Sequence, residues 1–130
     1  MRALFVAFLS VALCASAAYQ KDHKKPPDVQ ILEAKVRRIE QKITLDGRLR
    51  ATGEKPVQGL VIFFDFLSAE GQPLTSQRTG IDEEVLASGE EAAFHAETAA
   101  PPGAVKCRIR AFDEHERELR VANSGPFIIE

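Results

Sequence analysis

The chain has 130 residues, enough for one domain, and 45% of them are apolar and 28% charged, which is a globular composition rather than a disordered one. The formal net charge is −2, from 17 Lys and Arg against 19 Asp and Glu. The chain lacks the excess of positive charge that would indicate a nucleic-acid-binding surface, so no nucleic-acid partner is predicted.

Residues 1–18 have the pattern of a secretory signal peptide. Arg2 gives a short positive end, and the run from Ala3 to Ala18 carries no charge and ends in small residues suited to cleavage. The run is short for a membrane span, which needs about 20 residues. We therefore predict an exported protein, periplasmic or extracellular, that begins at Ala18 or Tyr19 and has no membrane span after cleavage.

Cys14 lies inside this segment and raises the alternative of a lipoprotein signal. Leu13 precedes it, however, where lipidation needs a small residue, so ordinary cleavage is favoured. Cleavage leaves Cys107 as the one cysteine of the mature chain. No internal disulfide is then available, and the hydrophobic core must stabilise the domain alone.

Residues 19–28, "YQKDHKKPPD", are polar and basic and end with two prolines, which is typical of a flexible tether that stiffens at its end. Residues 29–130 are predicted to form the folded domain.

The domain begins with two segments that we interpret as strands. Gln30–Ile39 has apolar residues at alternate positions, although Leu32, Val36 and Ile39 also fit the spacing of a helix. The strand is favoured because the next segment, Lys42–Ala51, alternates strictly between apolar and polar residues.

The next strand, Val57–Leu67, is apolar at both parities except at Asp65. One parity, which contains Phe64 and Phe66, is expected to face the core. The other parity contains three large apolar side chains that form a candidate partner surface: Val61, Phe63 and Leu67. This surface is expected to be covered internally, by the C-terminal "PFIIE" with Phe127, Ile128 and Ile129 or by the N-terminal segment, or else by a partner, which would be a second copy or another envelope protein.

Turns and strands then recur every 8–12 residues, as in β-sandwiches. They are the hairpin loop Ser68–Gln72, the polar edge strand Leu74–Gly80, the acidic loop Ile81–Glu91, the strand Ala92–Thr98 with Phe94 as its core anchor, the alternating strand Ala104–Phe112, and a last strand broken at Gly125-Pro126. The pattern predicts an all-β fold, an antiparallel immunoglobulin-like or fibronectin-III-like sandwich of about seven strands.

Residues with reactive side chains form no catalytic or metal-binding pattern. His23, His95 and His115 fall in the tether, a strand and a turn, without the spacing of a metal site. The acidic loop lacks the alternating oxygen ligands of a calcium loop. Cys107 is predicted to be an inert core residue, because it shares the inward parity of its strand with Val105. We predict no enzyme activity, no cofactor and no metal.

Two further features of the strands have structural explanations. Gly47 lies mid-strand on the inward parity, which indicates a bulge or a close approach of the sheets. Lys106, Arg108 and Arg110 form a basic ladder, and one arginine is expected to neutralise Asp65 on the neighbouring strand. The alternative for the ladder is a site for an anionic polymer or a carboxylate ligand.

The order of these segments resembles the FxLYD-type domains, which are small extracytoplasmic sandwiches of bacteria and archaea. The matching pieces are "LDGRLRATGEKPVQGLVIFFDFLSAEGQPL", "LASGEEAAFHAET" and the alternating strand that ends at Phe112. Residues 64–68 stand where F-x-L-Y-D would be, with Phe66 for Leu, Leu67 for Tyr and Ser68 for Asp. The resemblance implies an accessory or adhesive module without catalytic residues.

Together these observations favour a non-enzymatic exported domain that acts as a binding or envelope-assembly accessory module. The alternative is a purely structural stabilising domain with no ligand of its own.

Overall fold

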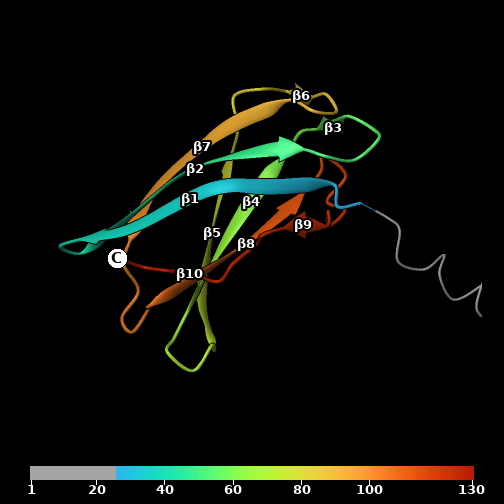
Figure 1. The fold of residues 1–130 in the computed structure, drawn as a ribbon. Helices are drawn as coiled ribbons and strands as arrows, with labels where there is room; N and C mark the ends of the chain where they lie inside the picture. Colours follow the sequence, from blue (N-terminus) through green and yellow to red (C-terminus); the bar gives the residue numbers. More distant parts are fainter. Residues whose placement is uncertain (1–25) are drawn as a thin grey trace, which may run out of the picture.

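The computed structural model describes residues 26–130, in which every regular element is a β-strand (Figure 1). The strands are β1 (Val29–Ile39), β2 (Lys42–Ala51), β3 (Val57–Gln58), β4 (Val61–Leu67), β5 (Pro73–Gly80), β6 (Val85–Leu86), β7 (Glu91–Ala99), β8 (Lys106–Phe112), β9 (Val121–Ala122) and β10 (Phe127–Ile128). The predicted all-β fold is confirmed. The predicted signal peptide, with Cys14, and most of the tether lie outside the described residues.

The strands form two four-stranded sheets and one two-stranded sheet. The neighbour order is β7-β2-β1-β9 in the first sheet and β10-β8-β4-β5 in the second, while β3 pairs with β6. The long strands of the two larger sheets cross one another (Figure 1), and both sheets contribute to a single buried hydrophobic cluster. Within residues 26–130 no helix is long and apolar enough to cross a membrane.

Alternation along β2 places its apolar residues in the core, as predicted. Ile43, Leu45 and Leu49 are at most 1% exposed. Gly47 continues the inward parity where there is no room for a side chain. A Cβ there would lie 2.3 Å from Cζ of Phe94 and 2.4 Å from the carbonyl oxygen of Glu33. Phe94 and Glu33 lie on β7 and β1, which flank β2 in the same sheet, so Gly47 makes room for a ring and a carbonyl of its own sheet and not for the predicted close approach of two sheets.

The inward parity of β1 differs from the prediction because the strand contains a bulge. The register with β2 shifts between Ile31 and Glu33. Ile31 and Val36 are buried although they lie at opposite parities, and Leu32 is only half-buried. One extra residue in a strand reverses which side chains face the core, so the parity of Leu32 and Val36 does not continue through the whole strand.

The predicted single strand Val57–Leu67 is interrupted, which is a correction. Gly59 has a φ of 63° and separates β3 from β4. The left-handed conformation suits glycine, and a Cβ there would lie 2.6 Å from Cβ of Glu114. The prediction of the Ile81–Glu91 segment as a loop is also partly wrong. It contains β6, whose Leu86 pairs with Val57 and is buried.

The C-terminal residues 118–130 join the two sheets, and we call this segment the strap. On one side, Leu119 N donates to Ala111 O at 2.9 Å in β8, and Ile129 N donates to Val105 O at 3.0 Å. On the other side, the strap bonds β1 near both of its ends, through Val29 N to Arg120 O at 3.1 Å and through Glu130 N to Val36 O at 2.9 Å. The strap therefore connects the edge of β8 with the edge of β1.

Alternation along β8 buries Cys107, Ile109 and Ala111, so the predicted core position of Cys107 is confirmed. Burial, together with the negative charge of Asp65, raises the pKa of the Cys107 thiol to about 12. Val105 does not share this parity. It precedes the first residue of β8 and is 40% exposed, so its predicted core position is wrong.

Substituting Gly47→Ala should lower the free energy of unfolding by about 1–3 kcal/mol, because the new methyl group overlaps both Phe94 and a backbone oxygen. Urea unfolding measures this. The control is Gly80→Ala, where the nearest atom to the new Cβ is Leu60 O at 4.0 Å and the expected change is within about 0.5 kcal/mol. Equal stability of both variants would contradict the close contacts at Gly47.

The Cys107 thiol should react slowly with a thiol reagent in native protein and rapidly in denaturant, because the side chain has no exposed area and the thiolate is disfavoured. The labelling rate at mild alkaline pH measures this. Native labelling as fast as that of a free thiol would contradict the assigned inward parity of β8.

Candidate functional site

The outer face of the β10-β8-β4-β5 sheet contains the residues that the sequence predicted as a partner surface. Ile62, Phe64 and Phe66 have no exposed area, so the alternate residues of β4 point away from the core. Pairing on both sides then places Phe63 between Arg78 of β5 and Arg110 of β8. An apolar outward position in β4 thus lies between two arginines.

Asp65 is the next outward residue of β4, and it binds both neighbouring strands. Arg110 of β8 donates to its carboxylate twice, from Nε to Oδ2 at 2.7 Å and from Nη2 to Oδ1 at 3.0 Å. Ser76 of β5 donates to Oδ1 at 2.6 Å. The predicted pairing of Asp65 with an arginine of the ladder is confirmed. The partner is diagonal, since Arg108 is directly opposite Asp65 in the register.

These bonds set the protonation of Asp65. Burial alone would raise the pKa of the carboxyl group, but the hydrogen bonds from Arg110 and Ser76 outweigh burial and hold the pKa below its ordinary value. The same pair raises the pKa of Arg110, chiefly through its hydrogen bond to Asp65. At neutral pH the pair is therefore fully charged.

The Arg110 guanidinium also lies over two aromatic rings. Its Cζ is 5.3 Å from the centroid of Phe63 and 5.5 Å from that of Phe112, and the two rings meet edge to face at 5.1 Å. Arg78 lies 5.8 Å from the centroid of Phe63. These distances are those of cation–π contacts. We call Phe63, Arg78, Arg110 and Phe112 the arginine–aromatic face.

Of the three predicted surface residues, Phe63 belongs to this face, Val61 lines the groove beside it, and Leu67 does neither. Val61 and Phe63 are half-buried. Leu67 is 2% exposed, so its assignment to an open surface is wrong. The β4–β5 register shifts between Phe66 and Leu67, and the opposite residue, Lys106, extends to within 3.5 Å of the Ala69 carbonyl oxygen in the following turn. The end of β4 is thus enclosed by the turn that follows it.

The hypothesis that residues 127–129 cover this face is also wrong. Phe127 and Ile129 pack against the core cluster. Ile128, opposite Lys106 in the register, is 65% exposed. Cover by the N-terminal segment stays a prediction, because most of that segment lies outside the described residues. Sequence reasoning missed Arg78 and Phe112. The parity of the basic ladder places Phe112 on the outer face, but stacking of Arg78 depends on the β4–β5 register, which alternation does not reveal.

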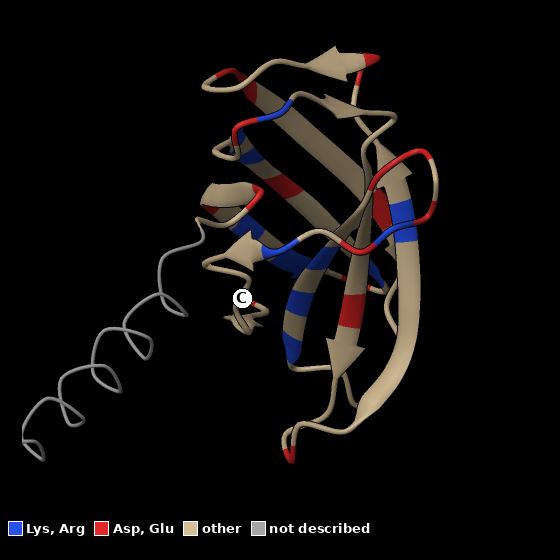
Figure 2. Cartoon of the chain, turned by 90° about the vertical axis from the view of Figure 1, so that its right-hand side faces the viewer, with Lys and Arg blue, Asp and Glu red and all other residues tan. Residues whose placement is uncertain are grey.

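Charges are separated along the outer face. A groove of about 530 Å³ runs beside the aromatic rings, and Glu114 and Glu116 line it after the end of β8. Lys106 and Arg108 lie on the outer face near the start of the same strand. Figure 2 shows basic bands along one strand of this sheet and a single acidic band on its neighbour. The face therefore has a basic end, an aromatic centre and an acidic end.

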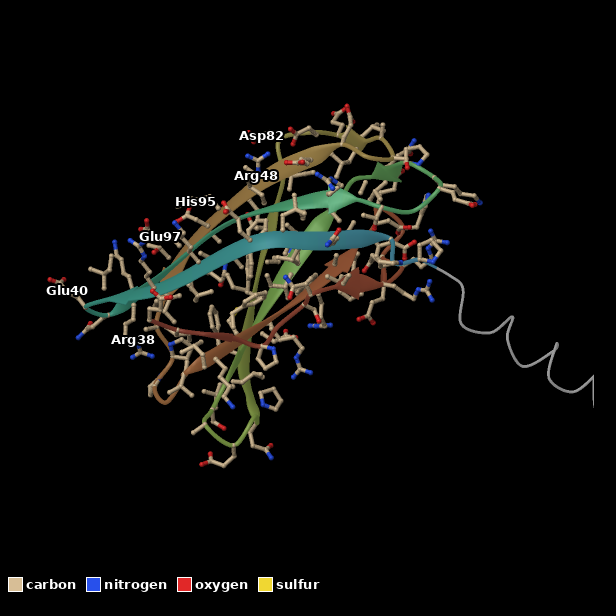
Figure 3. The ribbon with its side chains drawn as sticks, in the orientation of Figure 1. Arg38, Glu40, Arg48, Asp82, His95 and Glu97 are labelled. Atoms are coloured by element: carbon tan, nitrogen blue, oxygen red, sulfur yellow. The ribbon has the colours of Figure 1, made fainter. Side chains whose placement is uncertain are left out.

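The histidines of residues 26–130 lie elsewhere and are engaged in surface pairs. His95 extends from β7 into solvent (Figure 3), and its Nδ1 lies 2.5 Å from Oδ1 of Asp46, which raises the pKa of His95. His115 lies 3.8 Å from a Glu114 oxygen. The imidazole ring of each of these two histidines pairs with a carboxylate and not with a nucleophilic side chain that it could activate.

The acidic loop is partly neutralised by the protein itself. Arg50 and Arg48 both donate to the Glu91 carboxylate and lower its pKa. Asp82, which Figure 3 labels, is exposed, and so are the two glutamates that follow it. No group of three or more His, Cys, Asp or Glu side chains that could hold a metal ion occurs in the part of the chain that the structure describes.

No protein-family model and no curated protein matches this sequence. Among solved structures, IrmA from Escherichia coli is 14% identical, and 82% of this chain aligns with 99% of IrmA at a TM-score of 0.53. The ApaA protein of Bordetella pertussis is 15% identical over 78% of this chain and 98% of its own, at a TM-score of 0.45. The similarity to IrmA indicates a shared fold and no more.

Substituting Asp65→Asn should lower the free energy of unfolding by about 1–3 kcal/mol at neutral pH, because charge-assisted hydrogen bonds from Arg110 and Ser76 are weakened. The folded pKa of Asp65 is depressed, so this stability is complete above about pH 4 and disappears as pH falls through the folded pKa. The difference between the two proteins should therefore shrink in acid. Urea unfolding between pH 7 and pH 3 measures it.

The control is Asp46→Asn, which should cost much less, because Asp46 and its partner His95 are solvent-exposed. A difference between Asp65→Asn and the native protein that stays constant down to pH 3 would contradict the assigned ionisation of Asp65.

Proposed function

We propose that this chain is an exported, non-enzymatic module that binds other protein surfaces in the cell envelope through the arginine–aromatic face. The observation that carries the proposal is the partial exposure of Phe63 and Phe112 between arginines on the outer face of the sheet. Aromatic residues and arginine are enriched in protein–protein interfaces, where they contribute much of the binding energy.

We further infer that the fold is an immunoglobulin-like or fibronectin-III-like sandwich. The neighbours β1-β2-β7 correspond to the A-B-E strands of such domains, and β10-β8-β4 correspond to G-F-C. The strand β5 then takes the position beside C that is called C′. This order supports the proposed class. The resemblance of residues 45–112 to FxLYD-type domains supports an extracytoplasmic accessory role, and the signal-peptide pattern of residues 1–18 supports export.

The alternative is a purely structural domain with no ligand. It is favoured by one observation, that Arg110 covers parts of both aromatic rings and is itself bound to Asp65. In that case the outer face is stabilised by its own residues and needs no partner.

Site-specific photocrosslinking in cells that export the full chain separates these functions. A photoreactive residue in place of Phe63 should form a covalent adduct with a protein partner, whose mass distinguishes a second copy from another protein. The matched control is the same residue in place of Ile39, which is 57% exposed on the β1–β2 hairpin and lies outside the face. It should form no adduct of the same size.

Absence of a specific adduct at Phe63, in a chain that is exported and folded, would favour the purely structural domain. Retention of the chain in the cytoplasm would contradict the export part of the proposal.

A further inference from the structure

We propose that the occupant of the arginine–aromatic face is a second copy of this chain, related to the first by a two-fold axis. The proposal rests on the proposed function, since it names the partner of the same face. It is carried by the charge pattern of the face, whose two ends are complementary to each other.

The basic end is formed by Lys106 and Arg108. Both lie on the outward parity of β8, opposite Leu67 and Asp65, and neither takes part in the ion pairs formed within residues 26–130. Lys106 reaches only a backbone oxygen, at 3.5 Å. At this end of the face Lys106 has no ion-pair partner in the described chain, and the acidic neighbour of Arg108 is Asp65, whose carboxylate is already bound by Arg110.

The acidic end is formed by Glu114 and Glu116, which line the groove together with Phe63 and Phe112. Glu114 has only His115 as an ionic neighbour, at 3.8 Å, and Glu116 has none among the ion pairs of the described chain. The two ends of the face therefore carry opposite charges that the monomer leaves largely unpaired.

The aromatic centre lies between the two ends. The basic end is near the start of β8, the acidic end is in the turn that follows Phe112, and Arg110 lies on the outward parity of β8 between them. A two-fold axis at this point would place the aromatic centres of the two copies together. It would also place each basic end on the acidic end of the other copy. The two ends of one copy are about 20 Å apart along β8.

An anionic polymer fits the same face less well. It would be attracted by Lys106 and Arg108 but repelled by Glu114 and Glu116 at the other end of the same face. A second copy uses both ends. The face extends over about three strands and eight residues, roughly 400 Å² on each copy, which is about half the size of a standard interface. The expected dimer is therefore weak and sensitive to salt.

The first measurement is sedimentation equilibrium of the exported, processed chain over a range of concentrations at low and at high ionic strength. We expect a reversible monomer–dimer equilibrium whose dissociation constant rises at high salt, because the end-to-end attractions are screened. A chain that stays monomeric at millimolar concentration and low salt would overturn the inference.

The second measurement uses two charge-reversed variants, Lys106→Glu with Arg108→Glu and Glu114→Lys with Glu116→Lys. Each alone should associate at least about tenfold more weakly, because like charges then face each other in the dimer. An equal mixture of the two should associate again, since every contact in the mixed dimer joins opposite charges. Unfolding curves verify that each variant is folded. Two unfolded variants would not associate when they are mixed, so recovery of the dimer on mixing also excludes loss of folding as the cause of the weakened association.

The control is Lys35→Glu with Arg37→Glu, two exposed residues of β1 in the other sheet. It changes the net charge as much as Lys106→Glu with Arg108→Glu does, and it should leave the dimer intact. Mixed variants that stay monomeric would overturn the inference. A Phe63 adduct with a different protein, combined with a monomeric chain, would leave the proposed function standing and reject the second copy. No adduct and no dimer would reject both.

Discussion

The pairing of Asp65 with Arg110 organises the second sheet. Asp65 is the one buried polar or charged side chain of residues 26–130. A carboxylate removed from water must find charged or hydrogen-bonding partners, and Asp65 finds them on both adjacent strands, in Arg110 and Ser76. The pair therefore connects β8, β4 and β5 through side chains, in addition to the backbone ladders.

The same pair explains how β4 can be apolar at both parities. The inner residues are covered by the first sheet, while the outer residue Phe63 is covered in part by guanidinium groups. Arg110 is held by Asp65 and its planar group lies across Phe63 and Phe112, so one side chain both neutralises a buried charge and shields apolar surface. Protein surfaces that combine aromatic rings with arginine tolerate water when free and exclude it when a partner binds.

Much of the fold could be predicted from alternation, since β2 and β8 each bury one parity, and the glycine in β2 indicated a close contact. Alternation fails where the register changes. A bulge after Ile31 reverses the inward parity of β1, and a shift before Leu67 buries a residue that parity assigned to the surface. The site was predicted in part. The outward position of Phe63 follows from alternation along its strand, and the pairing of Asp65 with an arginine follows from the basic ladder on the neighbouring strand. The position of Arg78 depends on a hairpin register that only the folded chain defines.

The strap has a consequence for how the protein reaches its folded state. Its hydrogen bonds join residues far apart in the chain, such as Asp28 with Arg120 and Val36 with Glu130. Contacts between residues so far apart in the sequence form late, because closing the long loop between them costs conformational entropy before the new contacts can compensate for that cost. The edges of β1 and β8 therefore remain open until residues 118–130 are available to pair with them. Until then the unpaired edges of β1 and β8 can pair with other strands, so the partly folded protein is exposed to edge-to-edge association.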